Sequence, residues 1–205
     1  MRRKLRFPHL RRFRSEQSGN IAVEAAILLP IMIWGYLAMF TIFDTYRQYT
    51  TQQKAAYTVS DLISRQATPL DADFIDGSHE LFRTLTRSLT EPGLRVTIAK
   101  YDLVLEEYRV IWSRTRGGMV ALTSQDIANW SDRLPVLPQD DQIIIVETSS
   151  QYPPAFDIGL GLRNINNFVF TRPRYASQVC LNTGGEEICD LPNTVVPEPS
   201  EEDSA

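Results

Sequence analysis

The stretch SEQSGNIAVEAAILLPIMIW, residues 15–34, leads from a basic segment into the longest apolar run of the chain. It opens an apolar run from Ile21 to Phe43 in which Glu24 is the only charged side chain. A helix rises about 1.5 Å per residue, and about 20 apolar residues cross the hydrocarbon core of a bilayer. The sequence therefore predicts one transmembrane helix over residues 20–43.

The charges on the two sides of this run differ. Residues 1–19 carry seven Lys or Arg side chains and one Glu, a net charge of +6, whereas the whole chain carries −4, which leaves −10 for the remainder. Because cytoplasmic flanks are rich in Lys and Arg, the basic leader is expected in the cytoplasm and the residues after 43 across the membrane. A nucleic-acid-binding arm is disfavoured, because a hydrophobic span follows instead of a folded basic domain.

The apolar run is too long for an ordinary secretory signal, whose core is shorter and ends at a small-x-small cleavage site. The following residues, TIFDTYRQYT at 41–50, offer no such site. We therefore expect the apolar segment to stay attached to the chain. The simplest interpretation of these features is an uncleaved signal anchor.

A more specific interpretation comes from the order of basic leader, Gly19, four residues and Glu24 before the apolar helix. This order resembles the processing site of type IV pilins and pseudopilins. Within that class, SGNIAVEAAILLPIMI (18–33) is most similar to the TadE/TadF-like pseudopilins of the bacterial tight-adherence (Flp, type IVb) pilus system. The similarity covers roughly residues 11–36 and includes Ser18 and Pro30. FVFTRPRYASQV (168–179) also resembles the Arg-Pro-Arg segment found late in such proteins.

The resemblance implies that a prepilin peptidase cleaves the precursor after Gly19, which makes Asn20 the first residue of the mature chain. It also implies that the new α-amino group of one subunit neutralises Glu24 of its neighbour. Such an amine has an ordinary pKa of about 7.7–8.0 and is largely protonated at neutral pH. A charged side chain inside hydrocarbon costs about 2.5–3.5 kcal/mol on insertion scales, so a counter-charge is favourable. The alternative is that Glu24 lies near the headgroups with water.

The same resemblance implies the partners: the prepilin peptidase, the other pilins and pseudopilins of the Tad system, and the inner membrane. The chain is too long to resemble the major Flp pilin, which favours a minor pseudopilin. We expect a single-pass bacterial inner-membrane protein with a cytoplasmic N-terminus, a periplasmic C-terminal domain and association with the pilus after processing. The alternative is an unprocessed signal-anchored protein whose periplasmic domain binds an envelope partner. Neither interpretation involves nucleic acid or a small-molecule substrate.

Residues 44–67 contain no Gly or Pro and predict that the span continues outward as an amphipathic stalk helix. This helix is expected to end at Thr68–Pro69, because the residue before a proline disfavours helix. Pro30 removes one helical N–H group and predicts a bend within the span. The expected packed face of the stalk consists of Tyr49, Ala56, Val59, Leu62, Ile63 and Gln66.

A second helix is expected to begin after Asp71 or Asp73, since either is a suitable N-cap, and to end before Pro92–Gly93. The stretch DADFIDG (71–77) does not fit an EF-hand loop, which needs an oxygen ligand at position 5 and Glu at position 12. Counted from Asp71, these positions are Ile75 and Phe82. The apolar stripe of this helix is expected at Phe74, Ser78, Leu81, Phe82, Leu85 and Leu89.

Segments rich in β-branched and aromatic residues predict the strands of a sheet. The segment 142–152 is nearly continuous in Ile and Val and is expected to be central. A short helix capped by Thr123 or Ser124 is expected over 123–135. Arg172–Pro173–Arg174 predicts a turn with solvated arginines, with a contact surface as the alternative. The predicted strands are 94–105, 108–117, 142–152, 167–171 and 174–181.

The predicted fold class is therefore α+β: a long N-terminal transmembrane and stalk helix followed by a pilin-like periplasmic head with a second helix and an antiparallel-type sheet. The expected organisation is a basic cytoplasmic leader (1–19), the transmembrane helix (20–43), the stalk (44–67), the head (68–191) and a disordered acidic tail (192–205). The tail is rich in Pro and Glu, a composition that does not bury a core.

Two cysteines, Cys180 and Cys189, flank Gly184–Gly185, and a hairpin there would bring the thiols opposite each other. In an oxidising compartment we expect a disulfide. A metal pair is disfavoured, because neither His9 nor His79 lies near these cysteines. The sequence has no Gly-x-Ser-x-Gly, Walker or His-Glu-x-x-His motif, and we expect neither an enzyme nor a cofactor. His79, next to Glu80, is expected to be a surface histidine.

Overall fold

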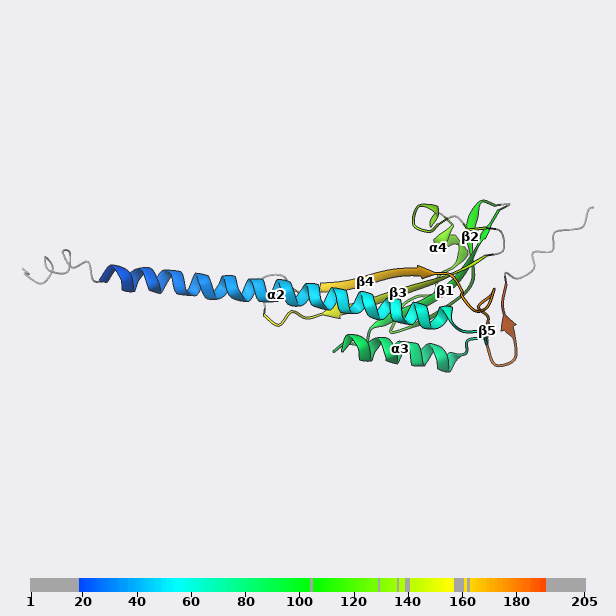
Figure 1. Ribbon diagram of the computed structural model, residues 1–205, viewed down its shortest axis with the longest axis horizontal. Coiled ribbons are helices and arrows are strands. Elements are labelled where there is room, and N and C mark those ends of the chain that lie inside the picture. Colours follow the sequence, from blue (N-terminus) through cyan, green and yellow to red (C-terminus); the bar gives the residue numbers. More distant parts are fainter. Residues whose placement is uncertain are drawn as a thin grey trace, which may run out of the picture. The chain divides into compact units, whose positions relative to one another are not determined.

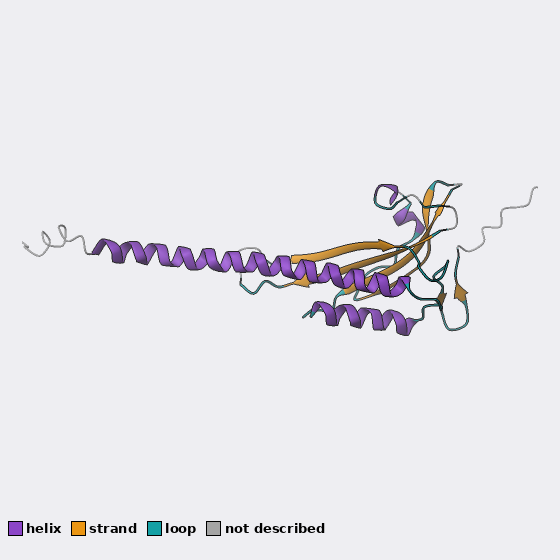
Figure 2. Ribbon diagram, viewed as in Figure 1, coloured by secondary structure: helices purple, strands orange, loops and turns teal. Residues whose placement is uncertain are grey.

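The computed structural model describes residues 19–103, 105–128, 130–135, 137–138, 141–156, 161 and 163–190. They form an α+β fold with a long N-terminal helix, a second helix and an antiparallel sheet, as the sequence predicts (Figures 1 and 2). The leader before Gly19 and the tail 192–205 lie outside the described residues.

Helix α2, Gly19–Ser64, runs without interruption from the apolar segment into the stalk. Pro30 lies inside it, and the helical conformation continues on both sides. The helix ends three residues before the predicted end of the stalk, where the Ser64 hydroxyl donates to the Asp61 carbonyl at 2.8 Å. The part up to Thr45 forms one compact unit with Pro154–Gly161, and the part from Tyr46 onward belongs to the unit that contains the sheet.

The sheet has four antiparallel strands in the order β2-β1-β3-β4. Their bounds are β1 Gly93–Asp102, β2 Glu107–Arg116, β3 Gln142–Tyr152 and β4 Arg163–Thr171. The central position expected for 142–152 is confirmed, because β3 pairs with β1 on one side and β4 on the other. A register shift lies between Ile98 and Ala99, opposite Trp112 and Val110, so that Ile111 is the extra residue of a β-bulge.

The part of α2 from Tyr46 onward and helix α3 (Ala72–Thr86) lie on one face of the sheet (Figure 2). Alternate strand residues point to opposite faces, and the apolar ones on this face pack with the helices in one core. This core includes Val59 and Ile63 of α2, Phe82 of α3, Val96 of β1 and Val146 of β3.

The other face of the sheet is covered by the connection between β2 and β3, which contains α4 (Ser124–Ile127) and a short 3-10 helix η1 (Trp130–Asp132). Thr123 precedes α4 in a capping box with Asp126, as one of the two expected caps. Ile127 packs with Ile143 and Ile145 of β3 in a second core.

The buried stripe of α3 differs from the predicted one by about one residue. The N-cap is Asp71, whose carboxylate accepts from the Phe74 N–H at 2.8 Å, which agrees with one of the two expected caps. The helix ends at Thr86 because Arg87 adopts a left-handed conformation, with φ of 50°. Leu85 is 41% exposed, and Leu89 lies beyond the helix at 87% exposure, so their predicted burial is wrong. The buried side chains are Ile75, Ser78, His79, Phe82 and Thr86.

On α2, the predicted packed face is correct for Ala56, Val59 and Ile63, which are fully buried. It is wrong for Tyr49, which is 46% exposed. At the level of Tyr49 the helix instead turns Gln52 inward, where the Gln52 Oε1 accepts from the Ser150 hydroxyl of β3 at 2.6 Å. A polar pair thus takes the place of the expected apolar contact.

The predicted strand 174–181 is wrong except at its last residue. Leu181–Asn182 (β5) pairs with Glu187–Ile188 (β6) in a separate two-stranded ribbon. The preceding backbone is satisfied by side chains instead: the Val179 N–H donates to the Gln142 Oε1 at 2.8 Å, and the Val179 carbonyl accepts from the Trp112 indole at 2.9 Å. Because these side chains bind the N–H and carbonyl groups of Val179, those groups are not available for the hydrogen bonds of a strand.

The ribbon is closed by a disulfide between Cys180 and Cys189, whose sulfurs are 2.11 Å apart. The cysteine pairing predicted from the sequence is thereby confirmed. The ribbon also holds the connection between α2 and α3, because the Leu70 N–H donates to the Cys180 carbonyl at 2.8 Å. The Gln142 amide donates to the Cys189 carbonyl at 2.6 Å, so one side chain of β3 binds both ends of the ribbon.

Candidate functional site

The N-terminal part of α2 presents a long apolar surface in which Glu24 is the only charged side chain. Every residue from Ile21 to Tyr36 is exposed in the isolated chain, including Met32 at 73% and Trp34 at 60%. Among the described residues, α2 is the helix that is long and apolar enough to cross a membrane by length and composition. So large an exposed apolar surface marks an interaction with lipid or with another apolar surface.

The predicted processing and assembly residues lie at the start of this surface. Gly19 and Asn20 are the first described residues of α2, and Glu24 follows Gly19 by five positions in the same helix. Glu24 is four positions after Asn20, which is about one helical turn. Glu24 is exposed, and it forms no ion pair with any other described residue. Its carboxylate is therefore available to a partner outside the described part of the chain.

Polar groups at the end of the apolar run are satisfied within the helix. The Thr41 hydroxyl donates to the Leu37 carbonyl at 2.9 Å, and the Thr45 hydroxyl donates to the Thr41 carbonyl at 2.8 Å. A hydroxyl that bonds to the preceding turn needs no water, which lowers the cost of placing it in an apolar environment. The run thus keeps its apolar character up to the charge of Asp44.

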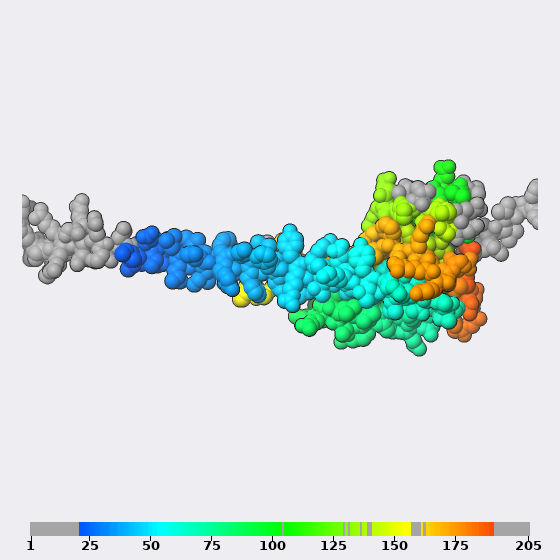
Figure 3. All heavy atoms as spheres, viewed as in Figure 1, coloured from blue at the N-terminus to red at the C-terminus, as the bar shows by residue number. Residues whose placement is uncertain are grey.

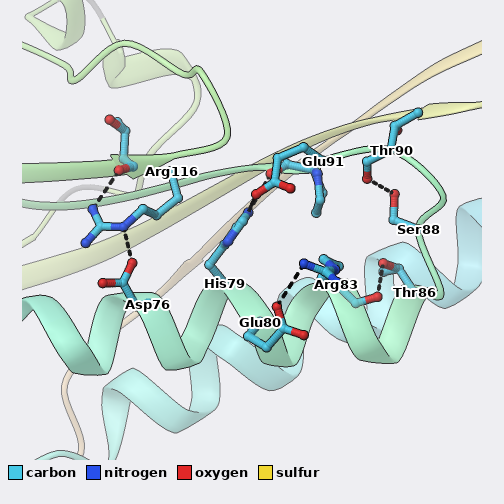
Figure 4. Close-up of polar contacts among 11 residues, drawn as sticks. Asp76, His79, Glu80, Arg83, Thr86, Ser88, Thr90, Glu91 and Arg116 are labelled. Carbon is cyan, nitrogen blue, oxygen red and sulfur yellow. Dashed lines mark hydrogen bonds and ion pairs between the residues drawn. The ribbon is translucent and has the colours of Figure 1, made fainter.

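His79 is buried, and the expectation of a surface histidine is wrong. Its side chain lies on α3 facing the start of β1, and the residue is 8% exposed (Figure 4). The Nε2 atom lies 2.7 Å from the Pro92 carbonyl oxygen. Because a carbonyl only accepts, Nε2 carries the proton and donates. Glu91 Oε1 lies 3.8 Å from the same nitrogen, whereas Glu80 pairs with Arg83 at 3.3 Å.

This histidine contact holds a crowded junction between α3 and the sheet. Gly117, at the end of β2, has φ of +65°, and a Cβ there would come within 2.0 Å of the Pro92 carbonyl oxygen. The left-handed conformation and the close approach both require glycine. His79 therefore binds the Pro92 carbonyl, and the missing side chain of Gly117 leaves room for it, so both residues have a structural role here.

An ion pair next to His79 ties α3 to the edge strand β2. The Arg116 Nε donates to the Asp76 carboxylate (Figure 4). This hydrogen bond lowers the pKa of Asp76 and raises the pKa of the Arg116 guanidinium. The two residues are 40 positions apart, and no local pattern in the sequence signalled their contact.

The Arg-Pro-Arg segment is irregular and leads into a bend that begins at Arg174. Its arginines are about half exposed, so the expectation of solvated arginines is confirmed. Arg172 pairs with Asp141 at 3.0 Å, and Arg174 pairs with Asp61 at 3.3 Å. The Arg174 N–H also donates to the Ser64 carbonyl, the last residue of α2, at 2.8 Å. This segment therefore closes the C-terminal end of α2 by bonding one of its free carbonyls.

A cleft of about 510 Å³ lies between the start of α3 and the disulfide-closed ribbon, lined in part by Asp71, Arg114, Arg116 and Asn182. Its charged groups include the helix cap and one member of the Asp76 ion pair, which have structural roles. In the described part of the chain, no three His, Cys, Asp or Glu side chains are arranged to hold a metal ion. The feature with the clearest chemical meaning is thus the apolar N-terminal helix with Glu24.

Comparisons of the chain with protein-family models, with curated proteins and with solved structures found no match. The functional interpretation therefore depends on the residues of the N-terminal segment and on the architecture that follows it.

Proposed function

We propose that this chain is a minor pseudopilin-like component of Tad/Flp pilus assembly, cleaved after Gly19 by a prepilin peptidase and assembled through its N-terminal helix. The observation that carries the proposal is the position of Gly19 and Glu24 within one continuous helix, ahead of its apolar run. That helix is exposed and apolar at first and then becomes part of the core of an α+β unit.

In this proposal, the apolar run up to Phe43 spans the inner membrane. The basic leader stays in the cytoplasm, since its net charge of +6 fits the inner side. The sheet, α3 and the disulfide-closed ribbon lie in the periplasm. An oxidising compartment suits the Cys180–Cys189 bond, because disulfides persist there and are rare in the cytosol.

Cleavage would change the electrostatics of the helix end. Removal of the leader takes away its cations and leaves an ammonium group on Asn20. An ammonium group at a helix N-terminus is unfavourable next to the helix dipole, so a carboxylate close by stabilises it. Glu24 of a neighbouring subunit would supply that carboxylate, and the pair would reduce the cost of holding either charge in hydrocarbon.

Two matched glycine variants test the proposal. Gly19→Val should block maturation in cells with an active prepilin peptidase, so that the membrane-extracted chain keeps its leader. Gly35→Val is the control, because Gly35 lies in the same helix and a Cβ there meets nothing within 4 Å. It should mature like the unmodified chain. If both variants and the unmodified chain keep the leader, the protein is instead an unprocessed signal-anchored protein with a partner-binding periplasmic domain. If Gly19→Val matures like the control, cleavage does not depend on Gly19 and the proposed processing site is wrong.

A further inference from the structure

The connection between β3 and β4 returns to the apolar end of α2. The Phe156 ring packs edge-to-face on the Phe40 ring, with 5.8 Å between the ring centroids. Residues Pro154–Gly161 and the helix up to Thr45 form one compact unit. In Figure 3, yellow atoms of this connection lie against the blue helix. Two segments that are 116 positions apart therefore meet at one level of the helix.

This level lies inside the apolar run and close to its end. Phe40 precedes Asp44, the first charged residue after the run, by four positions, which is about one helical turn. Thr41 is fully buried, whereas all other residues between Ile21 and Phe43 are exposed or half-buried. The contact with the β3–β4 connection thus begins before the apolar run ends.

The aromatic side chains at this level keep much of their surface uncovered. Phe156 is 42% exposed, Phe40 is 45% exposed and Phe43 is 63% exposed. No charged residue occurs among Pro154–Phe156 or among residues 37–43. An apolar patch of this kind is unfavourable in water and suits the boundary between headgroups and acyl chains. The patch is also continuous with the surface that the proposed span presents to lipid.

We propose that Phe156 is a second membrane contact of this protein, inserted beside Phe40 at the outer boundary of the bilayer. The inference rests on the proposed membrane span and adds to it a contact from a distant part of the chain. The occupant of the patch is lipid. Insertion of Phe156 would fix the depth of α2 and limit its rotation, since a single helix is otherwise free to shift and turn in the bilayer.

Spin labelling of the full chain tests this inference in vesicles of phosphatidylethanolamine with phosphatidylglycerol. A nitroxide is attached to Phe156→Cys without reductant, so that the Cys180–Cys189 bond stays closed. The rate at which the nitroxide collides with oxygen, which is enriched in lipid, is compared with the rate at which it collides with a water-soluble nickel chelate. Phe170→Cys is the matched water control, because Phe170 lies on β4 and is 44% exposed. Met32→Cys, in the middle of the apolar run, is the lipid control.

The expected result is that oxygen collides more often than the nickel chelate at positions 156 and 32, and less often at position 170. If position 32 is in lipid but position 156 behaves like position 170, the inference is wrong while the span stands. If position 32 also behaves like position 170, the proposed span itself is wrong. Protection of position 156 from both reagents would overturn the inference as well, because protein would then cover the patch. If Phe156→Cys does not fold, the nitroxide is attached to Ala155→Cys instead, and the same collision rates are expected there.

Discussion

Among single residues, Glu24 has the most important part in the proposed function. The carboxylate is exposed at the start of the apolar surface and has no ion-pair partner among the other described residues. A charge in hydrocarbon costs about 2.5–3.5 kcal/mol on insertion scales, so such a residue needs a functional explanation. The proposed pairing with a neighbouring N-terminal amine supplies one.

Glu24→Gln should therefore reduce assembly and leave membrane insertion and cleavage unchanged. The amide has a similar shape but cannot neutralise the ammonium group of a neighbouring subunit. Crosslinking between subunits in cells measures assembly, and the mass of the N-terminal peptide measures cleavage. Glu24→Asp keeps the charge and serves as the control. If Glu24→Gln crosslinks as efficiently as the unmodified chain, the charge pair has no role in assembly.

The Asp76–Arg116 pair gives a prediction about pH. The hydrogen bond from Arg116 lowers the pKa of Asp76 in the folded state, and an unfolded Asp has a pKa of about 3.9. The folded state then binds fewer protons, so the stabilisation is fully present above that pH and is lost as the pH falls through the lower, folded value. Asp76→Asn should lower the free energy of unfolding at pH 7 and weaken its decline below about pH 4.

Chemical unfolding of the full chain in detergent at neutral and acid pH measures this effect. Asp73→Asn is a suitable control, because Asp73 lies in the same helix and has no ion pair among the described residues. The prediction is contradicted if Asp76→Asn and Asp73→Asn lose stability in parallel at both pH values.

At the scale of elements, α3 is held mainly by its buried stripe. Phe82 is fully buried in the core between α3 and the sheet. Phe82→Ala should lower the free energy of unfolding by about 3–5 kcal/mol, because it removes buried apolar surface and leaves a cavity. Leu89→Ala, at a residue that is 87% exposed, should change it by less than about 0.5 kcal/mol. Equal effects of the two substitutions in urea unfolding would show that the stripe is assigned wrongly.

The disulfide-closed ribbon is the second element that can be tested by itself. Its backbone holds the connection between α2 and α3 through Leu70, and Gln142 holds both of its ends. The double substitution Cys180→Ser and Cys189→Ser should lower the free energy of unfolding by about 2–3 kcal/mol, as expected for a short closed loop. Thermal unfolding with and without reductant measures the stabilisation that the disulfide provides. Reductant should lower the unfolding temperature of the unmodified chain and leave that of the double variant unchanged. A reductant effect of equal size on both would contradict the prediction.

The elements also show what sequence patterns predict well. The bounds of β1, β2 and β3 agree with the prediction within a few residues, because these segments are rich in β-branched and aromatic residues. The prediction for Leu89 is wrong because the sequence does not reveal that Arg87 ends the helix in a left-handed conformation. The segment before β5 was mistaken for a strand because Gln142 and Trp112, both distant in sequence, bind its backbone.

At the scale of the whole molecule, one helix belongs to both compact units. Its apolar part up to Thr45 associates with Pro154–Gly161, and its later part contributes Ala56, Val59 and Ile63 to the core on the sheet. The candidate site at Gly19 and Glu24 could be predicted because its pattern is local. The contacts of Phe156 with Phe40 and of His79 with Pro92 could not be predicted, since they depend on how distant segments meet.

The most direct test of the central claim is the intact mass of the chain extracted from membranes of cells with an active prepilin peptidase. The proposed function predicts a mature protein that begins at Asn20 and lacks the basic leader of residues 1–19. In cells without the peptidase, the same chain should begin at Met1. A chain that begins at Met1 in both kinds of cell would contradict the account.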